Sequence, residues 1–178
     1  YCSHDNCPHQ SIFCGPKAVV EEVKSRLQKA KILSQILPFT SGFHAPYFEP
    51  YAQAISAHLD RFDIQVPHTP SWSASTLEKY PDQASQLANG TLQALSAKHL
   101  VESVRFRELI EHMYQEGVRV FIQVGLGSLS SFVDDTLRGK EYLTLDAHSE
   151  RKGSMEQLLH VAGGLFSAGY NLDLGVWL

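Results

Sequence analysis

The 178-residue chain has few cysteines, no excess of positive charge and no long apolar run. Its three cysteines show no evident pairing, which is typical of a reducing compartment, and its formal net charge of −4 gives no basic footprint for nucleic acid. No apolar run approaches the roughly 20 residues of a membrane-spanning helix, and the first residues do not resemble a signal peptide. We therefore expect a cytoplasmic protein that binds neither nucleic acid nor membranes.

A nucleophile motif is also missing. No Gly-x-Ser-x-Gly elbow, the turn that presents a catalytic serine in α/β-hydrolase folds, occurs anywhere in the chain. The sequence begins with Tyr1 rather than Met, inside a segment that already resembles a strand. We therefore expect these residues to be a piece of a longer protein.

The residues that are present predict a globular α/β protein. Hydrophobic residues make up 43% of the chain and charged residues 19%, which is ordinary for a folded domain. Residues 118–124 (VRVFIQV) are apolar on both faces, as in a strand inside a covered parallel sheet. The other expected strands are a pair within residues 2–15, joined by a turn of Asp5, Asn6 and Pro8, and single strands at 32–39 and 142–145. The expected helices are residues 17–30, 47–62, most of 82–116, 128–139 and 155–170.

One histidine lies where a catalytic base is often found. The run SGFHAP at 41–46 places His44 at the junction between the expected strand 32–39 and the expected helix 47–62. Such a turn can hold the ring rigidly while one nitrogen faces a cleft, and the histidine pKa lies near working pH. A structural or solvated histidine is the alternative. The nearest serine, Ser41, is too close on the same turn to serve as its nucleophile, so His44 looks like half of a catalytic site.

A cluster of cysteine and histidine residues near the start raises the possibility of zinc. Its members are Cys2, His4, Cys7, His9 and Cys14. Structural zinc usually takes close Cys-x-x-Cys pairs on a tight turn, whereas here the cysteines are separated by four and six residues. Packing and turn roles explain the cluster better, although a zinc-stapled module stays open as an alternative.

A glycine-containing turn follows the expected strand 118–124. Gly125-Leu126-Gly127 resembles the start of a dinucleotide-binding fingerprint, but Ser130 stands where the third glycine belongs. A tight turn from strand to helix is the simpler interpretation.

Taken in order, five segments resemble the second half of malonyl-type acyltransferase domains. Such domains occur in fatty acid synthases, in polyketide synthases and as free-standing malonyl-CoA:acyl-carrier-protein transacylases. The family's Asn-x-Pro-x-Gln segment, AFHSP turn, PVRF helix start and ELGPG turn are similar to Asn6–Gln10, residues 42–46, residues 103–106 and residues 123–127. The final run, LFSAGYNLDLGVWL, resembles the closing helix and loop of the synthase domains.

The resemblance implies a fold and a division into subdomains. Residues 1–41 would form an incomplete ferredoxin-like small subdomain. Residues 42–178 would form the C-terminal part of a large subdomain that resembles the α/β-hydrolases. The first strand and helix of the small subdomain, and the serine elbow, would lie in the missing N-terminal half.

The resemblance also implies site residues. His44 would be the general base that serves an acyl-serine intermediate, oriented by the backbone carbonyl of His99. The family more often has Asn or Gln at the position of His99, but a carbonyl does not depend on its side chain. Phe43, directly before the histidine, goes with malonyl rather than methylmalonyl in modular synthases. Asn6 and Gln10 would be further substrate-binding residues.

The implied substrates are malonyl-CoA and the phosphopantetheine thiol of an acyl carrier protein, with no tightly bound cofactor and no metal. The implied partners are that carrier protein, the missing half and neighbouring synthase domains. Without a nucleophile, this chain alone is predicted to be inactive. Four sites depart from the family motifs: Ser41-Gly42, Ser103, Gln123 and Leu126. The departures around His44 and at Leu126 keep a second hypothesis open: a non-catalytic acyltransferase-like scaffold or carrier-protein docking element.

Overall fold

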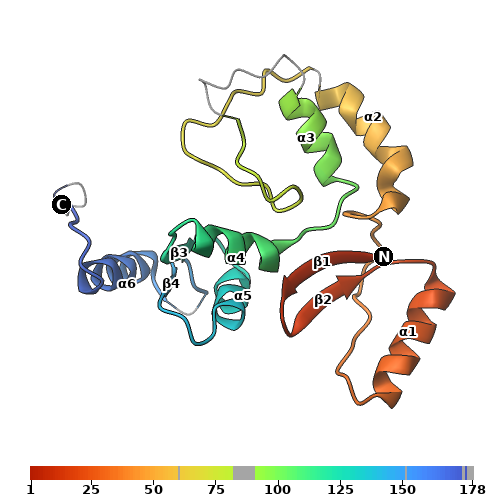
Figure 1. Ribbon diagram of the computed structural model, residues 1–178, viewed down its shortest axis with the longest axis horizontal. Coiled ribbons are helices and arrows are strands. Elements are labelled where there is room, and N and C mark those ends of the chain that lie inside the picture. Colours follow the sequence, from red (N-terminus) through yellow and green to blue (C-terminus); the bar gives the residue numbers. More distant parts are fainter. Residues whose placement is uncertain (60, 82–90, 151, 174, 176–178) are drawn as a thin grey trace. The chain divides into compact units, whose positions relative to one another are not determined.

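The computed structural model describes residues 1–59, 61–81, 91–150, 152–173 and 175. The chain divides into two compact units, unit 1 over Tyr1–Leu109 and unit 2 over Ile110–Leu178. Figure 1 labels their helices and strands in chain order. Among the described residues, none of the helices is both long and apolar enough to cross a membrane.

Unit 1 opens with an antiparallel hairpin, β1 (Cys2–Cys7) and β2 (Gln10–Phe13). Its turn is Pro8-His9, so the expected turn at Asp5, Asn6 and Pro8 was wrong for the first two residues, which lie in β1. Asp5 stays in the strand because its backbone N–H donates to the Val104 carbonyl, 2.8 Å away. Pro8 has no N–H to contribute to the ladder, which favours its place in the turn.

Helix α1 (Lys17–Lys29) follows as expected, but the strand expected at residues 32–39 is absent. Residues 32–37 have no regular secondary structure, and the side chain of Leu33 is fully exposed. A β-strand is stable only when neighbouring strands satisfy its backbone groups. Within the described part of the chain, no strand pairs with this segment.

A short 3₁₀ turn, η1 (Pro46–Phe48), leads into α2 (Glu49–Leu59), which packs against α3 (Thr91–His99). In Figure 1 these two helices lie next to each other. Residues 82–90 of the expected helix 82–116 lie outside the described residues. The rest is two helices, α3 and α4 (Phe106–Gln115), because residues 103–104 run beside β1 and Val104 forms a parallel bridge with His4.

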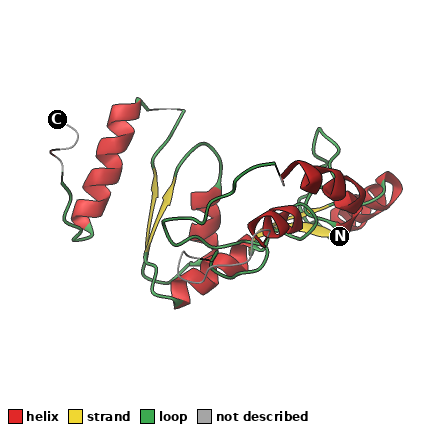
Figure 2. Ribbon diagram, turned by 90° about the horizontal axis from the view of Figure 1, so that it is seen from above, coloured by secondary structure: helices red, strands yellow, loops and turns green. Residues whose placement is uncertain are grey.

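Unit 2 contains a two-stranded parallel sheet of β3 (Val120–Gln123) and β4 (Leu143–Asp146), drawn as yellow arrows with helices around them in Figure 2. Helices α5 (Leu129–Thr136) and α6 (Ser154–Ser167) pack against it, and Leu137 is completely buried. The expectation that residues 118–124 are covered on both faces was wrong. Ile122 and Val124 are 40% and 85% exposed because, in the described residues, β3 has only one neighbouring strand.

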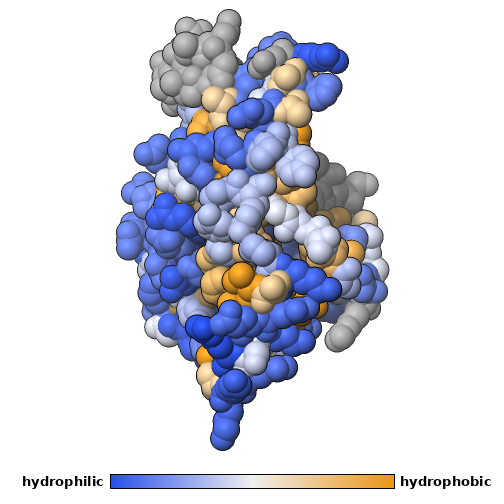
Figure 3. Space-filling view, turned by 90° about the vertical axis from the view of Figure 1, so that its right-hand side faces the viewer, coloured by the Kyte–Doolittle hydropathy of each residue, from blue (hydrophilic) through white to orange (hydrophobic). Residues whose placement is uncertain are grey.

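Large apolar side chains lie exposed in both units, and Figure 3 shows apolar surface, in orange, between polar regions on the face that it presents. They include Leu33, Phe39 and Tyr51 in unit 1 and Val124 and Phe166 in unit 2. Burying such side chains contributes about 1.5–3 kcal/mol each. Much apolar surface is therefore left available for further contacts.

Candidate active site

His44 adopts an unusual backbone conformation directly before η1. Its φ is +59°, in the left-handed region that costs a non-glycine residue about 1 kcal/mol. Such outliers persist where the surroundings hold them, and they gather at functional sites. The following residue, Ala45, is buried and extended, and Pro46 begins the 3₁₀ turn.

Two hydrogen bonds to the C-terminal end of α3 hold His44. Its backbone N–H donates to the Leu100 carbonyl at 2.8 Å, and its Nδ1 lies 2.6 Å from the His99 carbonyl oxygen. The last carbonyls of a helix have no partner within the helix, so His44 satisfies two groups that would otherwise lack one. Because a carbonyl only accepts, Nδ1 carries the proton and Nε2 of the neutral ring has a free lone pair. In the described part of the chain, no hydrogen bond occupies Nε2.

His4, on β1, contacts the same ring from another side. The His4 and His44 rings meet edge to face, with centroids 4.8 Å apart. The Ser3 hydroxyl donates to the Ile12 carbonyl, so His4 Nδ1, 3.0 Å from Ser3 Oγ, is the donor in that pair. Burial lowers the pKa of His4, and the neighbouring His44 lowers it further. A neutral imidazole therefore faces the proposed base.

The side chain of His99 points to a different group of residues. Its Nε2 is 2.7 Å from the Tyr80 hydroxyl and 3.0 Å from Ser73 Oγ. Burial lowers the pKa of His99, as does His44, whereas Glu102 acts in the opposite direction. Burial also raises the pKa of Tyr80. A neutral His99 whose Nε2 accepts the Tyr80 proton satisfies these observations.

Phe43 lines an open apolar hollow beside His44. Its ring stacks on Phe48 with centroids 4.1 Å apart, and the Phe43 and His44 centroids are 6.3 Å apart. The hollow has a volume of about 560 Å³. It is lined by Phe39, Thr40, Ser41, Gly42, Phe43, Tyr47, Phe48 and Tyr51.

Asn6 and Gln10 are brought together, though not against His44. The buried Asn6 donates from Nδ2 to Gln10 Oε1 across the hairpin turn. Among the described residues, no contact joins this pair to the His44 ring. The structure thus groups His44, His99 and Phe43, and it leaves the hairpin pair as a separate feature.

Three residues that contact His44 or His99 were missed by sequence reasoning. The sequence pattern marks His4 only as a candidate zinc ligand, and the alternation along β1 does not indicate that it faces His44. Ser73 and Tyr80 lie in an irregular loop, far along the chain from His99, and no pattern signals such a contact. Across the described residues, no three His, Cys, Asp or Glu side chains gather closely enough to hold a metal ion.

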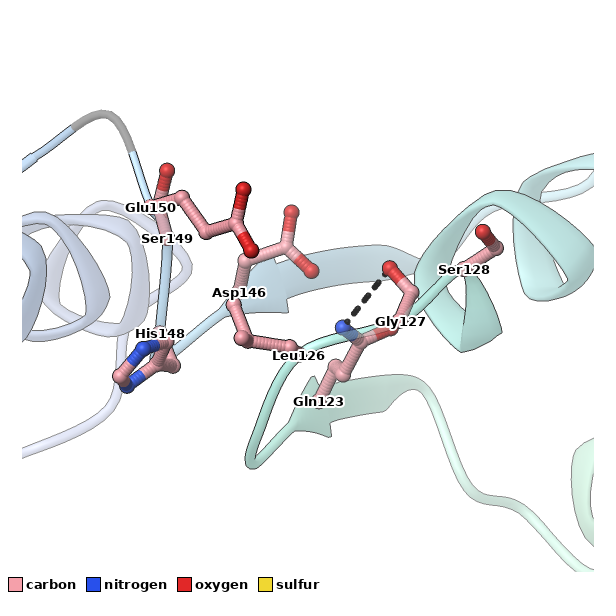
Figure 4. Close-up of a pocket in the computed structure, with 8 residues that line it drawn as sticks. All are labelled: Gln123, Leu126, Gly127, Ser128, Asp146, His148, Ser149 and Glu150. Carbon is pink, nitrogen blue, oxygen red and sulfur yellow. Dashed lines mark hydrogen bonds between the residues drawn. The ribbon is translucent and has the colours of Figure 1, made fainter.

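In unit 2 the Gly125–Gly127 turn leads from β3 to α5. Gly125 and Gly127 have φ of +105° and +141°. The Gln123 amide donates to both their carbonyls, at 3.0 and 3.2 Å, and accepts from the Ser130 N–H at 2.9 Å. An open hollow of about 360 Å³ lies at this edge. In Figure 4 the Asp146 and Glu150 carboxylates lie on one side of it and His148 on another.

No protein-family model matches the chain. The malonyl CoA-acyl carrier protein transacylase of Bacillus subtilis is 31% identical over 131 residues, or 71% of this chain and 38% of that protein. A polyunsaturated fatty acid synthase polypeptide of Thraustochytrium sp. is 27% identical over 178 residues, or 97% of this chain and 6% of that protein. The acyltransferase domain from the second module of the salinomycin polyketide synthase matches with a TM-score of 0.82 at 24% identity, covering 98% of this chain and 40% of that one.

The structural match shows the fold: the chain has the mixed α/β fold of part of an acyltransferase domain. They cover most of this chain but well under two thirds of each of the three proteins. The chain is therefore homologous to malonyl-CoA acyl carrier protein transacylases and to the acyltransferase domains of fatty acid and polyketide synthases, and it corresponds to part of those longer proteins.

Proposed function

We propose that the longer protein to which these residues correspond transfers a malonyl group from coenzyme A to an acyl carrier protein. His44 is the general base, and a serine outside this chain is the nucleophile. One observation carries the proposal. The His44 Nδ1–H is directed to the His99 carbonyl at 2.6 Å, which leaves Nε2 as the basic atom. A base in a Ser-His pair needs this tautomer.

The chemistry proceeds in two balanced halves. His44 Nε2 takes the serine proton as the oxygen attacks the malonyl thioester, and the resulting imidazolium returns that proton to the departing coenzyme A thiolate. In the second half Nε2 takes the proton of the phosphopantetheine thiol as its sulfur attacks the acyl-serine, and the serine oxygen recovers the proton as it leaves. The carbonyl end of α3 stabilises the positive imidazolium in both halves.

Phe43 is the proposed determinant of the acyl group. Its stacking on Phe48 fixes the ring beside His44, so an α-methyl branch would meet a rigid wall. A pocket wall discriminates one methyl group by about 1–3 kcal/mol. We expect Phe43→Ser to raise the ratio of methylmalonyl to malonyl adduct by about tenfold, measured as the two masses formed from an equal mixture of both thioesters. An unchanged ratio would remove Phe43 from this role.

The partners follow from the same proposal. They are an acyl carrier protein, the N-terminal half of the domain and neighbouring synthase domains, with no tightly bound cofactor. We further propose that residues 1–41 belong to the small ferredoxin-like subdomain and residues 42–178 to the large one, with Asn6 and Gln10 near the substrate. The cytoplasmic location stays a prediction.

The test uses the longer polypeptide, in which these 178 residues follow the segment expected to carry the serine elbow. It is incubated with malonyl-CoA and weighed intact by mass spectrometry. His44→Ala is compared with His58→Ala, a matched change at an exposed histidine on α2. We expect a malonyl adduct in the parent and in His58→Ala, and loss of at least about 10³-fold in its rate of formation in His44→Ala. The 178-residue chain alone should give no adduct.

Two results would overturn the proposal. A well-folded longer polypeptide that forms no adduct with malonyl-CoA or methylmalonyl-CoA is a scaffold or docking element rather than a transferase. An adduct that forms equally fast in His44→Ala would leave the transferase but remove His44 as its base.

A further inference from the structure

We propose that the imidazole of His99 is a positioning residue: held by Ser73 and Tyr80, it fixes the α3 carbonyl that accepts the His44 Nδ1–H. The inference deepens the proposed function and rests on it, because the consequence for catalysis follows only if His44 is the base. It assigns a role to the His99 side chain. The backbone carbonyl alone would be present with any residue at this position.

The backbone carbonyl and the side chain of His99 contact two different parts of the chain. Its carbonyl oxygen is 2.6 Å from His44 Nδ1, while its Nε2 meets the Tyr80 hydroxyl at 2.7 Å and Ser73 Oγ at 3.0 Å. Ser73 is only 2% exposed, and the Tyr80 and His99 rings are nearly parallel, 9° apart. A single residue therefore links the turn at His44 to the loop at residues 71–80.

That loop is rigid enough to act as an anchor. Ser73 N–H donates to the Glu78 carbonyl at 2.9 Å, and the Tyr80 N–H donates to the Ser71 carbonyl at 2.7 Å. Ser73 Oγ also accepts from the N–H groups of Ser75 and Thr76, each at 3.2 Å. The loop is tied to the start of α4 as well, because the Arg105 N–H donates to the Ala74 carbonyl at 2.8 Å.

The end of α3 needs such an anchor. Helix ends fray because their last carbonyls lack helical partners, and α3 has only nine residues. Leu100 and Val101 continue it as a loose turn, with N–H donors directed to the Ala97 and Lys98 carbonyls at 3.1 Å. A hydrogen bond as short as that of His44 is lost if the carbonyl moves by about 1 Å, and a misplacement of that size can cost about a hundredfold in rate.

Burial of the neighbouring histidines keeps a second positive charge away from His44. The titratable groups around the cluster are His4, His99, Tyr80 and Glu102. Burial favours the neutral forms of both neighbouring histidines. The imidazolium formed on His44 during transfer is therefore not opposed by a charged His99.

The first experiment needs no catalytic activity. The Nδ1–H proton of His44 is observed by NMR in the 178-residue chain, and its exchange with water is measured for Tyr80→Phe and Ser73→Ala. Ser71→Ala is the matched control in the same loop, because its hydroxyl contacts Thr69 and not His99. We expect exchange about tenfold faster in the first two variants and unchanged in the control. Unchanged exchange in all three would overturn the inference. If Tyr80→Phe fails to fold, Ser73→Ala decides.

The second experiment measures the rate of malonyl adduct formation in the longer polypeptide. We expect Tyr80→Phe and His99→Asn each to slow adduct formation about tenfold at saturating malonyl-CoA, with little change in half-saturation. Tyr80→Phe should have no further effect in His99→Asn, since both break one link, and His99→Gln should recover part of the rate. Additive losses, or losses seen only in half-saturation, would contradict a positioning role. If the parent itself forms no adduct, the proposed function fails. The NMR experiment still tests whether Ser73 and Tyr80 hold the carbonyl of His99 in place.

Discussion

Both units contain a turn with positive φ angles that leads into a helix, but different types of residue adopt these angles in the two units. In unit 2 the positive φ angles fall on Gly125 and Gly127, which adopt them without a steric penalty. In unit 1 the positive φ falls on His44, and hydrogen bonds to the end of α3 hold it there. In unit 2 the side-chain amide of Gln123 supports the turn by donating hydrogen bonds to the carbonyls of both glycines. This difference fits the proposal that His44 acts through its ring.

The largest effect expected from this comparison is that of His44→Gly. Glycine relieves the strain at φ +59° but removes the Nδ1 bond, so the free energy of unfolding should change by less than about 1 kcal/mol. Malonyl adduct formation in the longer polypeptide should fall at least about 10³-fold. Urea unfolding and intact mass measure the two quantities. A variant that unfolds more readily by several kcal/mol would show that the turn, rather than the ring, required the histidine.

In unit 2 the largest expected effect is on stability. Gln123→Leu keeps most of the side-chain volume but removes three hydrogen bonds, one of them to the Ser130 N–H at the start of α5. We expect a loss of about 2–3 kcal/mol in the free energy of unfolding. Gln115→Leu, at an exposed position on α4, is the control and should change little. Equal effects of the two changes would mean that the amide does not support the turn.

A smaller effect tests the glycine turn itself. A Cβ at Gly127 would meet no atom within 4 Å, so Gly127→Ala isolates backbone strain at φ +141° from steric clash. It should cost about 1–2 kcal/mol. Gly163→Ala, in α6 with equally open surroundings, should instead stabilise by about 0.5–1 kcal/mol. Urea midpoints of the two variants give the contrast. A stabilising Gly127→Ala would contradict the role of glycine in this turn.

The sequence predicted the features that depend on local pattern or on recognisable motifs. The hairpin, α1, the parallel strands and the placement of Phe43 and His44 next to a helix are of this kind. The strand expected at 32–39 failed because strands require partners, which a local pattern cannot supply. The contacts of His4, Ser73 and Tyr80 could not be predicted, since each joins segments through packing of irregular loops. His44 and His99 were paired only through the family resemblance.

The smallest expected effect concerns pH. His4 and His99 have folded-state pKa values below 6.5, lowered first by burial and then by His44. The unfolded chain therefore binds more protons than the folded one below that pH, so the free energy of unfolding should fall as the pH is lowered from 7 through the interval beneath 6.5. Glu108, whose pKa is lowered by its hydrogen bond with Arg105, adds a slope of the same sign only at lower pH, where a glutamate of the unfolded chain begins to bind a proton.

A comparison of two variants separates the contribution of His4 to this pH dependence from that of other groups. His4→Phe, which keeps an aromatic edge against His44, should reduce the dependence of urea stability on pH between 7 and 5.5, whereas His58→Gln at an exposed site should not. Amide exchange, corrected for its intrinsic pH dependence, should show the acid-induced loosening in unit 1 and not around Gln123. In unit 2 amide and glycine groups hold the turn, and neither titrates in this range. Equal loosening of both turns would contradict the difference between them.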